Sequence, residues 1–366
     1  MLFQSNKNLM SEIASLPIPD GDLQTPCLVV LEEAMLHNLH QTAEHAGGID
    51  RLMPHVKTHR ALWVAEWMIT NGITSLKAAT PIEVELALQA GAEHVLWAYP
   101  TANGFNIDRV IDAANGYPEA IVKVLFDCEA GYRAWKDRLQ IKPAENIRFV
   151  LDLDPGMGRT GADIEGDAAH LARRAHQDGL FAGIHIYDGH IQDADKEIRI
   201  EKNRENVARV TALISSLRGE GINDELIASG SYSFDIWPES IAGYVSPGSF
   251  IYSSAQHQHE LSHLKWKIGA YVIASVVSVR PGSATLDAGS KAISPDMLMR
   301  ERFSGAGAIT GMSEEHSVVK TDELKVGDRL ALVSKHTCTS VYLYPRALVK
   351  TLDGRWEYRD QLGNMR

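Results

Sequence analysis

The sequence predicts an eight-stranded parallel α/β barrel followed by a domain built of β-strands. Between residues 51 and 254, apolar runs of strand length alternate with helical patterns through roughly eight units, which is the rhythm of such a barrel. Glycine or asparagine often separates a helix from the next strand, as in Asn71-Gly72. Beyond Ser254 the alternation ceases, and β-branched and aromatic runs are broken by turn residues. With 366 residues, 45% of them hydrophobic, the chain can bury a core in both parts.

In chain order, residues 1–25 read as a polar lead-in, and the apolar run Cys27–Leu31 reads as a buried strand followed by an amphipathic helix. Alternating strands and helices then form the expected barrel. We expect its strands at residues 51–56, 75–79, 94–99, 120–126, 147–154, 181–187, 225–229 and 241–246. We expect helices between them at residues 61–70, 82–89, 107–114, 129–139, 164–177 and 196–217.

After the barrel, the polar stretch 253–263 reads as a linker or loop. The strands expected beyond it lie at residues 270–280, 283–289, 316–320, 328–334 and 340–345. The predicted organisation is therefore a barrel over residues 26–254 and a β-domain over residues 255–366, with the lead-in 1–25 packing on the β-domain.

Composition narrows the class of protein. A net charge of -11 argues against binding to nucleic acid or to an anionic membrane surface. The three cysteines are far apart in sequence, which argues against a disulfide framework and favours a reducing compartment. The N-terminal residues lack the apolar core of a secretory signal, and no apolar run approaches the roughly 18 residues of a membrane span. We therefore expect a soluble cytoplasmic protein that acts on small molecules.

Lys57 is the first candidate functional residue. It follows a short apolar strand that ends at Pro54, and His55 and His59 flank it. Neighbouring cationic groups and a helix start can lower the pKa of a lysine, and an unprotonated amine can form a Schiff base with an aldehyde. A lysine in such a loop is more often an ordinary surface residue, so other signals must support this role.

Other barrel strands also end in polar residues, and functional side chains of barrels lie at the C-terminal ends of strands. Strand 147–154 leads into a glycine-rich loop carrying Arg159, whose ordinary role would be a salt bridge at the rim. Strand 181–187 ends in Tyr187 and His190, which could equally be rim packing. The strand ends therefore supply three further candidate functional groups besides Lys57, namely a guanidinium cation, an aromatic hydroxyl and an imidazole.

The loops after the last two strands consist of small residues. Barrels commonly bind phosphate there through backbone N–H groups and short hydroxyls, although each loop alone could be a simple turn. Together with Lys57, they indicate an aldehyde cofactor that carries a phosphate, and pyridoxal 5'-phosphate is the candidate. The phosphate-binding residues that we expect are Ser229, Gly230, Ser231, Gly248 and Ser249.

At this point the motifs PHVKTH, LDPGMGRTG and VSPGSFIY resemble those of fold-type III pyridoxal-phosphate enzymes, whose barrel is alanine racemase-like. The resemblance implies that Lys57 forms the Schiff base and that Arg159 contacts the phenolic oxygen of the cofactor. It further implies that Tyr187 lies by the pyridine nitrogen and that His55 lines the cofactor site. LDAGSKAIS, SEEHSVV and SKHTCTSVYLYP resemble the D-threonine aldolase and D-serine dehydratase branch.

This branch binds a divalent metal through a His-x-Cys or His-x-Asp pair, which here would be His336 and Cys338. If both lie on a strand, their side chains point to the same side and can reach one ion. Imidazole with thiolate suits zinc best, with manganese or magnesium as the other possibilities. Open positions on the metal would leave room for the β-hydroxyl group of a substrate.

The resemblance therefore implies a metal-dependent lyase for D-3-hydroxy amino acids, with Lys57, Tyr187 and His190 as catalytic residues. Dehydration to a keto acid and retro-aldol cleavage to glycine both stay open, as does the identity of the substrate. In the aldolase motif a histidine follows the glutamine after the strand-six tyrosine, whereas Asp193 follows Gln192 here. This departure and the His-x-Cys pair favour the dehydratase reading.

Two alternatives remain at this stage. A metal-independent amino-acid racemase would need a second base, for which Tyr342 or Tyr344 is a poor match. A non-catalytic pyridoxal-phosphate binding protein would resemble the barrel alone, so the β-domain argues against it. Enzymes of the resembled family pair as homodimers, and we expect the same here. The walls around the substituent on Cβ could include Trp97, Trp237 and His257.

Overall fold

The computed structural model describes residues 7–222 and 225–366. The chain divides into two compact units. The barrel unit comprises residues Ala43–Lys57 and Ala61–Gly248, with Arg366. The β unit comprises the described residues up to Thr42, together with Thr58–Arg60 and Ser249–Met365. Within the described ranges, no helix combines the length and the apolar character needed to cross a membrane.

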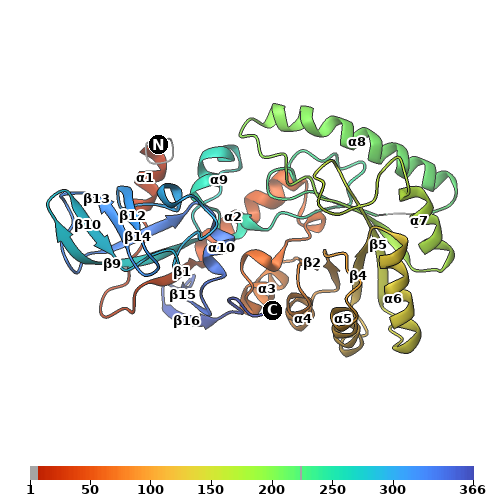
Figure 1. The fold of residues 1–366 in the computed structure, drawn as a ribbon, viewed down its shortest axis with the longest axis horizontal. Helices are drawn as coiled ribbons and strands as arrows, with labels where there is room; N and C mark the ends of the chain where they lie inside the picture. The colour runs from red at the N-terminus through yellow and green to blue at the C-terminus, as the bar shows by residue number, and fades with distance from the viewer. Residues whose placement is uncertain (1–6, 223–224) are drawn as a thin grey trace. The chain divides into compact units, whose positions relative to one another are not determined.

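The barrel unit contains a parallel sheet of seven strands in sequential order, with helices on its outside (Figure 1). Its strands are β2 (Ser75–Ala78), β3 (His94–Trp97), β4 (Ile121–Phe126), β5 (Ile147–Leu153), β6 (Phe181–Ile186), β7 (Leu226–Ala228) and β8 (Tyr244–Val245). Its helices are α3 (Leu62–Thr70), α4 (Pro81–Gln89), α5 (Gly104–Gly116), α6 (Glu129–Ile141), α7 (Ala168–Gln177) and α8 (Lys196–Gly219). The expected α/β alternation is confirmed, although α7 begins four residues later than predicted.

The sheet closes through the segment that we expected as the first strand. Leu52 forms a parallel bridge with Val245, and His55 forms one with Lys77, so the segment joins β8 to β2. It is not a regular strand, because Pro54 has no N–H to donate. Instead it lies between two 3-10 turns, η2 (Ile49–Arg51) and η3 (Val56–Thr58). The prediction of an eight-fold barrel is thus confirmed, whereas the prediction of a regular strand at residues 51–56 was wrong.

The β unit is built on a nine-stranded sheet. Its main path runs β12-β13-β10-β9-β1-β15-β16; β14 pairs with β9, and β11 with β14. The strands are β1 (Cys27–Leu31), β9 (Ala270–Arg280), β10 (Ser283–Leu286), β11 (Phe303–Ser304), β12 (Ala308–Met312), β13 (Ser317–Lys320), β14 (Arg329–Ser334), β15 (Arg346–Lys350) and β16 (Trp356–Asp360). The strands expected at 270–280, 316–320 and 328–334 are confirmed.

Short helical segments of the β unit differ from prediction. The expected linker at 253–263 contains α9 (Ala255–Glu260) and η5 (Ser262–Leu264), because the Ser254 hydroxyl accepts a hydrogen bond from the His257 N–H and caps the helix. The lead-in contains α1 (Lys7–Ala14), and its Leu9 and Ile13 pack in one cluster with Val29. The remaining segments are α2 (Glu32–Ala46), which continues into the barrel unit, η4 (Ser249–Ile251), η6 (Met299–Glu301) and α10 (Thr337–Val341).

Aromatic side chains fill the layer between the barrel sheet and its helices. Trp135 of α6 is fully buried, with ring centroids 5.9 Å from Trp97 and 6.1 Å from Phe149. Trp97 is itself 1% exposed in this layer. It therefore belongs to the core, and its expected role as a wall of the substrate site was wrong.

Replacing Trp135 by alanine should lower the free energy of unfolding by roughly 3–5 kcal/mol, because a large buried ring leaves a cavity. Urea unfolding followed by circular dichroism measures this loss. Phe105→Ala is the control, because Phe105 is 75% exposed and its removal should change stability by less than about 0.5 kcal/mol. An equal effect of the two substitutions would contradict this assignment of the core.

Candidate functional site

Lys57 lies in the 3-10 turn η3, directly after the bridge that His55 makes with Lys77. Its backbone N–H donates to Nδ1 of His55, 3.4 Å away. The Lys57 side chain is exposed, and its Nζ lies 5.7 Å from the centroid of the Tyr187 ring. Burial lowers the pKa of His55 well below its usual value, and the positive charges of Lys57 and Lys77 add to the effect. His55 is therefore a neutral imidazole beside the lysine.

The Tyr187 ring, just after β6, is the point on which several cationic side chains converge. The Arg159 guanidinium lies 4.9 Å from the ring centroid, nearer than the amine of Lys57. On the ring's edges, a Cβ added at Gly230 would lie 2.7 Å from a ring carbon of Tyr187, and one at Gly189 only 2.3 Å. Glycine is therefore required at both positions for the ring to lie where it does.

The loop that carries Arg159 is shaped by hydrogen bonds to Asp154. Backbone N–H groups of Gly156 and Gly158 donate to the Asp154 carboxylate at 3.0 and 3.1 Å. Gly161 has φ of 111°, and a Cβ there would lie 2.3 Å from the backbone nitrogen of Asp154. Glycine is needed at this turn, which brings Arg159 back toward Tyr187.

Lys57 and Arg159 bring two positively charged groups to the Tyr187 ring. Among the residues that the structure describes, neither Lys57 nor Arg159 forms an ion pair, although both lie near the Tyr187 ring. The ring face offers only weak compensation for such charge at an exposed site. The geometry thus suits an anionic ligand with more than one negative group.

The two predicted phosphate-binding loops lie side by side. Ser231 follows β7, and its hydroxyl accepts a hydrogen bond from the Gly248 N–H at 3.3 Å. Ser229 has φ of 73°, and its hydroxyl accepts from the Ser246 N–H at 3.4 Å. Ser249 belongs to the β unit, where its hydroxyl lies 3.3 Å from Nε2 of His257. The structure therefore joins the two loops through Ser229 and Ser231.

His190 is exposed, and no hydrogen bond joins it to another residue that the structure describes. Its neighbour Asp188 is buried instead, and accepts hydrogen bonds from the Ser233 hydroxyl at 2.5 Å and the Trp237 indole at 2.9 Å. Burial raises the pKa of Asp188 despite these bonds. Asp188 thereby ties the Tyr187 loop to the loop after β7.

Sequence reasoning missed three polar residues inside the barrel. Lys77 of β2, Asp152 of β5 and His185 of β6 are all buried, and hydrogen bonds connect them in a chain. The signal was available, because each is a polar residue flanked on both sides by apolar residues of its strand. In a barrel whose outer face is covered by helices, such a residue must point inward.

The predicted metal pair lies in the β unit. The expected strand at 340–345 is not formed; His336 precedes the helix α10, and Cys338 lies within it. The turn is favoured because the hydroxyls of Thr339 and Ser340 both donate to the carbonyl of His336. The strand argument for placing the two side chains on one face was therefore wrong.

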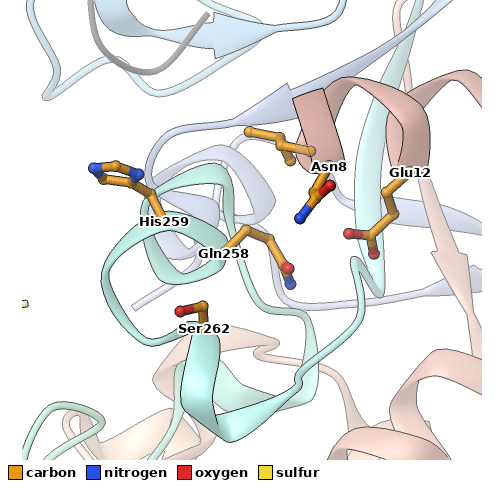
Figure 2. Close-up of a pocket in the computed structure, with 6 residues that line it drawn as sticks. Asn8, Glu12, Gln258, His259 and Ser262 are labelled. Atoms are coloured by element: carbon orange, nitrogen blue, oxygen red, sulfur yellow. The ribbon is translucent and has the colours of Figure 1, made fainter. Parts of the chain in front are cut away.

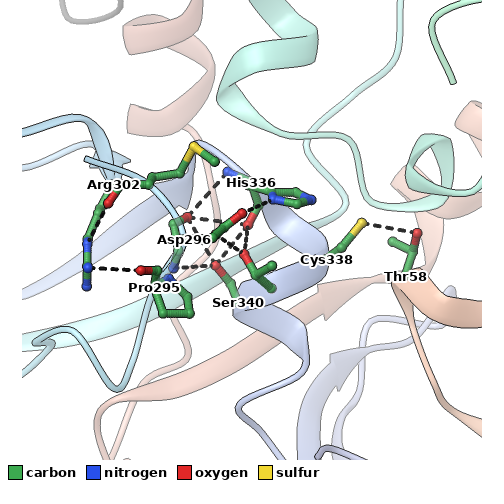
Figure 3. Close-up of polar contacts among 10 residues, drawn as sticks. Thr58, Pro295, Asp296, Arg302, His336, Cys338 and Ser340 are labelled. Carbon is green, nitrogen blue, oxygen red and sulfur yellow. Dashed lines mark hydrogen bonds and ion pairs between the residues drawn. The ribbon is translucent and has the colours of Figure 1, made fainter. Parts of the chain in front are cut away.

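The two side chains are nevertheless neighbours (Figure 3). Burial acts to lower the pKa of His336, but a hydrogen bond to Cys338 and the charge of Asp296 raise it to about 9. Nδ1 of His336 lies 2.5 Å from the Asp296 carboxylate, and Sγ of Cys338 lies 3.2 Å from the Thr58 hydroxyl. Thr58 is the residue that follows Lys57 in the chain.

Across residues 7–222 and 225–366, no group of three or more histidine, cysteine, aspartate and glutamate side chains is arranged to hold a metal ion. His336 and Cys338 are thus a two-residue set. A pocket of about 340 Å³ elsewhere in the β unit (Figure 2) is lined by Asn8, Leu9, Glu12, Gln258, His259 and Ser262, and so by none of the predicted site residues.

The two tyrosines considered as a second base are engaged elsewhere. The Tyr344 hydroxyl donates to the Ala292 carbonyl at 2.9 Å, and the Tyr342 hydroxyl donates to the Asn364 carbonyl at 3.3 Å. Burial raises the pKa of Tyr344 far above its usual value. A tyrosine that acts as a base must lose its proton readily, so Tyr344 is poorly suited to that task.

Comparison with known protein families gives two matches. The family model described as "Alanine racemase, N-terminal domain" matches residues 30–256, which is more than half of the chain. A serine dehydratase domain model matches residues 269–350. The racemase model matches the part of the chain that contains the barrel, and the dehydratase model matches the β-strand region that follows it. The family resemblance inferred from the motifs is confirmed.

Individual relatives share about a quarter of their residues with this chain. A 3-hydroxy-D-aspartate aldolase of Paracoccus denitrificans (strain Pd 1222) is 27% identical over 352 residues, covering 89% of this chain and 88% of that protein. A D-threo-3-hydroxyaspartate dehydratase of Delftia sp. (strain HT23) is 22% identical, covering 92% of this chain and 97% of that protein.

Among solved structures, the D-threonine aldolase of Filomicrobium marinum superposes with a TM-score of 0.83 at 22% identity. The match covers 95% of this chain and 99% of that chain. An alanine racemase of Clostridium difficile 630 superposes with a TM-score of 0.71 at 12% identity. The alanine racemase-like fold with an added β-domain is thereby confirmed.

Proposed function

The chain belongs to the alanine racemase N-terminal domain family, and on that premise we propose that it is a pyridoxal-phosphate- and metal-dependent lyase for D-3-hydroxy amino acids. The observation that carries this proposal is the convergence of Lys57 and Arg159 on the Tyr187 ring without an ion pair from any described residue. A cofactor with an aldehyde and a phenolic oxygen would bond covalently to the Lys57 amine and pair its phenolic oxygen with the Arg159 guanidinium. The names of the 3-hydroxyaspartate aldolase and dehydratase relatives support the substrate class.

Pyridoxal 5'-phosphate, when bound, supplies an aldehyde for a lysine and an electron sink for bonds at Cα. The residues present fit it. Lys57 would hold the aldehyde carbon, Arg159 the phenolic oxygen, and Tyr187 and His55 would line the ring. The small residues after β7 and β8 would bind the phosphate through backbone N–H groups and short hydroxyls, and these are Ser229, Gly230, Ser231, Gly248 and Ser249.

Each barrel residue then has a task that its own chemistry allows. Lys57 Nζ would accept or return the proton at Cα of the substrate. The Tyr187 hydroxyl is a neutral partner for the pyridine nitrogen. His190 is exposed and could exchange a proton with the β-hydroxyl group. Proton movement at Cα or at the β-hydroxyl decides whether the keto acid or glycine is formed.

His336 and Cys338 fit a divalent cation by the chemistry of their donors, with zinc the first choice and manganese or magnesium the others. The Asp296 carboxylate bonds to Nδ1 of His336, so Nε2 is the ring nitrogen that would bind a metal, and carboxylates commonly orient metal-binding histidines in this way. A cation there would polarise the β-hydroxyl group of the substrate and assist its loss or deprotonation.

Asp296→Asn should weaken zinc binding by about 10-fold or more, because an amide orients the His336 ring less strongly than a carboxylate does. Competition with a chromophoric chelator measures the affinity. Asp322→Asn serves as the control, since Asp322 also accepts a backbone hydrogen bond in the β unit but has no contact with His336. Equal zinc affinity in the two variants would show that Asp296 does not position the ligand.

The substrate class is tested by product analysis. Protein loaded with cofactor and zinc is offered D-serine, D-threonine and D-threo-3-hydroxyaspartate, with the L-enantiomers as controls. The last of the D-substrates yields oxaloacetate and ammonia by dehydration, or glycine and glyoxylate by retro-aldol cleavage. From each D-compound, dehydration gives the corresponding keto acid with ammonia, and retro-aldol cleavage gives glycine with the corresponding aldehyde. We expect one of these two outcomes from the D-enantiomers only. Absence of both keto acid with ammonia and glycine with aldehyde from all three D-compounds would overturn the proposal.

By resemblance we further infer a cytoplasmic homodimer. The engagement of Tyr342 and Tyr344 by backbone carbonyls weighs against the racemase alternative. Sedimentation of the purified holoenzyme measures the assembly, and a monomer that retains full lyase activity would exclude the dimer as the working form.

A further inference from the structure

Three buried side chains inside the barrel form a continuous chain of hydrogen bonds. Nζ of Lys77 lies 2.7 Å from Nε2 of His185, and Nδ1 of His185 lies 2.6 Å from Oδ1 of Asp152. Each of the three residues is at most 4% exposed. The hydroxyl of Thr160 donates to the other carboxylate oxygen of Asp152 at 2.8 Å. The acidic end of the chain is thus fixed within the protein.

The direction of the protons follows from the chemistry of the groups. An ionised carboxylate can only accept, so Nδ1 of His185 carries a hydrogen that it donates to Asp152. Nε2 of His185 is then the acceptor for Lys77. Burial lowers the pKa of His185 to about 4, with the charge of Lys77 adding to this, so the imidazole is neutral near pH 7. An amine, a base and an orienting carboxylate are therefore lined up in the order of a catalytic triad.

A second buried lysine of the same barrel shows the ordinary structural solution. Lys123 of β4 is 6% exposed and pairs directly with the Glu225 carboxylate. Lys77 bonds instead to the imidazole of His185. The carboxylate of this hydrogen-bonded series belongs to Asp152, which bonds to the other nitrogen of that imidazole. Buried charges in proteins are ordinarily paired with an opposite charge, so the imidazole partner of Lys77 departs from the usual structural arrangement.

Lys77, like Lys57, has its amine near the Tyr187 ring. Its Nζ lies 5.7 Å from the Tyr187 ring centroid, the value found for Lys57 Nζ. The charged and titratable groups that face it are His55, Lys57, Asp152, Arg159, His185 and Asp188. Burial and the charge of Lys57 lower the pKa of Lys77 to about 7, against the opposing effect of Asp152. Both protonation states of its amine are then accessible near neutral pH.

We propose that Asp152, His185 and Lys77 form a proton relay, and that Lys77 is a second acid–base amine of the cofactor site beside Lys57. This inference rests on the proposed function. When the Lys77 ammonium gives a proton to a group in the site, the amine that remains keeps its hydrogen bond to Nε2 of His185. When the amine accepts a proton, it can pass one to Nε2, and the resulting imidazolium is held against the Asp152 carboxylate. Each transfer breaks one bond to hydrogen at the donor and forms one at the acceptor, so the exchange is balanced.

The test follows the visible absorption of the covalently held cofactor against pH in holoenzyme variants. The visible absorption of the wild-type holoenzyme should change with a midpoint near pH 7, because the Lys77 ammonium loses its charge there. Lys77→Gln and Lys77→Arg should lack that change, because neither side chain titrates there. Asp152→Asn should move the midpoint to lower pH, because the Asp152 charge favours the Lys77 ammonium. Lys123→Met is the matched control and should keep the wild-type midpoint.

Turnover gives the second readout. Lys77→Arg retains the positive charge but cannot exchange a proton, so its kcat should fall by about 10²-fold and its pH profile should lose the limb near neutrality. Lys123→Met should keep the wild-type profile. If Lys77→Gln and Lys77→Arg both retain the wild-type absorbance midpoint and pH profile, the relay is overturned. Loss of the midpoint in Lys123→Met would also overturn it, because any buried lysine would then have the same effect.

The outcomes separate this inference from the proposed function. A wild-type protein that forms no covalent bond to the cofactor would overturn both. A protein that holds the cofactor but cleaves no D-3-hydroxy amino acid would overturn the proposed function alone, because the absorbance titration still decides the role of Lys77. If Lys77→Gln fails to fold, the charge-preserving Lys77→Arg carries the test.

Discussion

Lys57→Ala should abolish the covalent attachment of pyridoxal 5'-phosphate and lower kcat by roughly 10³-fold or more. Lys57 is exposed in the turn after the barrel-closing segment, has no ion pair among the described residues, and lies by the Tyr187 ring. Its amine can therefore reach an aldehyde without first breaking a salt bridge. Borohydride reduction of the holoenzyme, followed by peptide mass analysis, measures the attachment directly.

Lys202→Ala is the control for this substitution. Lys202 is also an exposed lysine of the barrel unit, but it pairs with Asp193 at 2.7 Å and lies on α8. Its removal should leave both attachment and kcat as in wild type. Reduced cofactor found on a peptide other than that of Lys57 in the wild-type protein would contradict the assignment.

His336→Ala and Cys338→Ala should each remove the bound divalent metal and lower kcat by about 10²–10³-fold, a loss like that of a single group that stabilises the transition state. The visible absorption of the cofactor should persist, because both residues belong to the β unit whereas Lys57 belongs to the barrel unit. Elemental analysis of the purified variants measures the metal content.

Cys128→Ala provides the matched control for the cysteine. Cys128 is an exposed free cysteine that caps α6 and belongs to the barrel unit, whereas Cys338 belongs to the β unit. This variant should keep its metal and its activity. A Cys338→Ala variant with full metal content and full activity would contradict a metal role for the pair.

The barrel could be predicted because its strands are apolar runs separated by amphipathic helices, a pattern written locally in the sequence. The strand ends carrying Lys57, Arg159 and Tyr187 followed from that pattern and the known placement of barrel sites. The structure brings these three residues together, with Arg159 and Lys57 facing the Tyr187 ring. Topology was enough to predict that these three side chains lie together in the candidate site.

The secondary-structure predictions that were wrong depended on single side chains rather than on repeating sequence patterns. Pro54 prevents a regular strand before Lys57, and the hydroxyls of Thr339 and Ser340 close a helical turn where β-branched and aromatic residues indicated a strand. Cys27–Leu31 is a strand, but pairing with β9 and β15 puts it in the sheet of the β unit. Such long-range pairings leave no local signal in the sequence.

The interior polar chain was missed for a different reason. Lys77 and His185 each lie in a sequence run that is predicted as a strand. That prediction depends on the apolar neighbours and gives no role to the polar residue between them. Their significance appears only once the barrel closes and their side chains are seen to meet. Polar residues that alternate within the strands of a predicted barrel are therefore candidates for its interior chemistry.

The most direct test of the metal-dependent lyase is a single reaction of the zinc-loaded holoenzyme with D-threo-3-hydroxyaspartate, in which EDTA and then excess zinc are added in turn. We expect formation of oxaloacetate with ammonia, or of glycine with glyoxylate, to stop with EDTA and to resume with zinc. A reaction that yields only the epimer at Cα and continues unchanged through both additions would contradict the metal-dependent lyase and leave a racemase in its place.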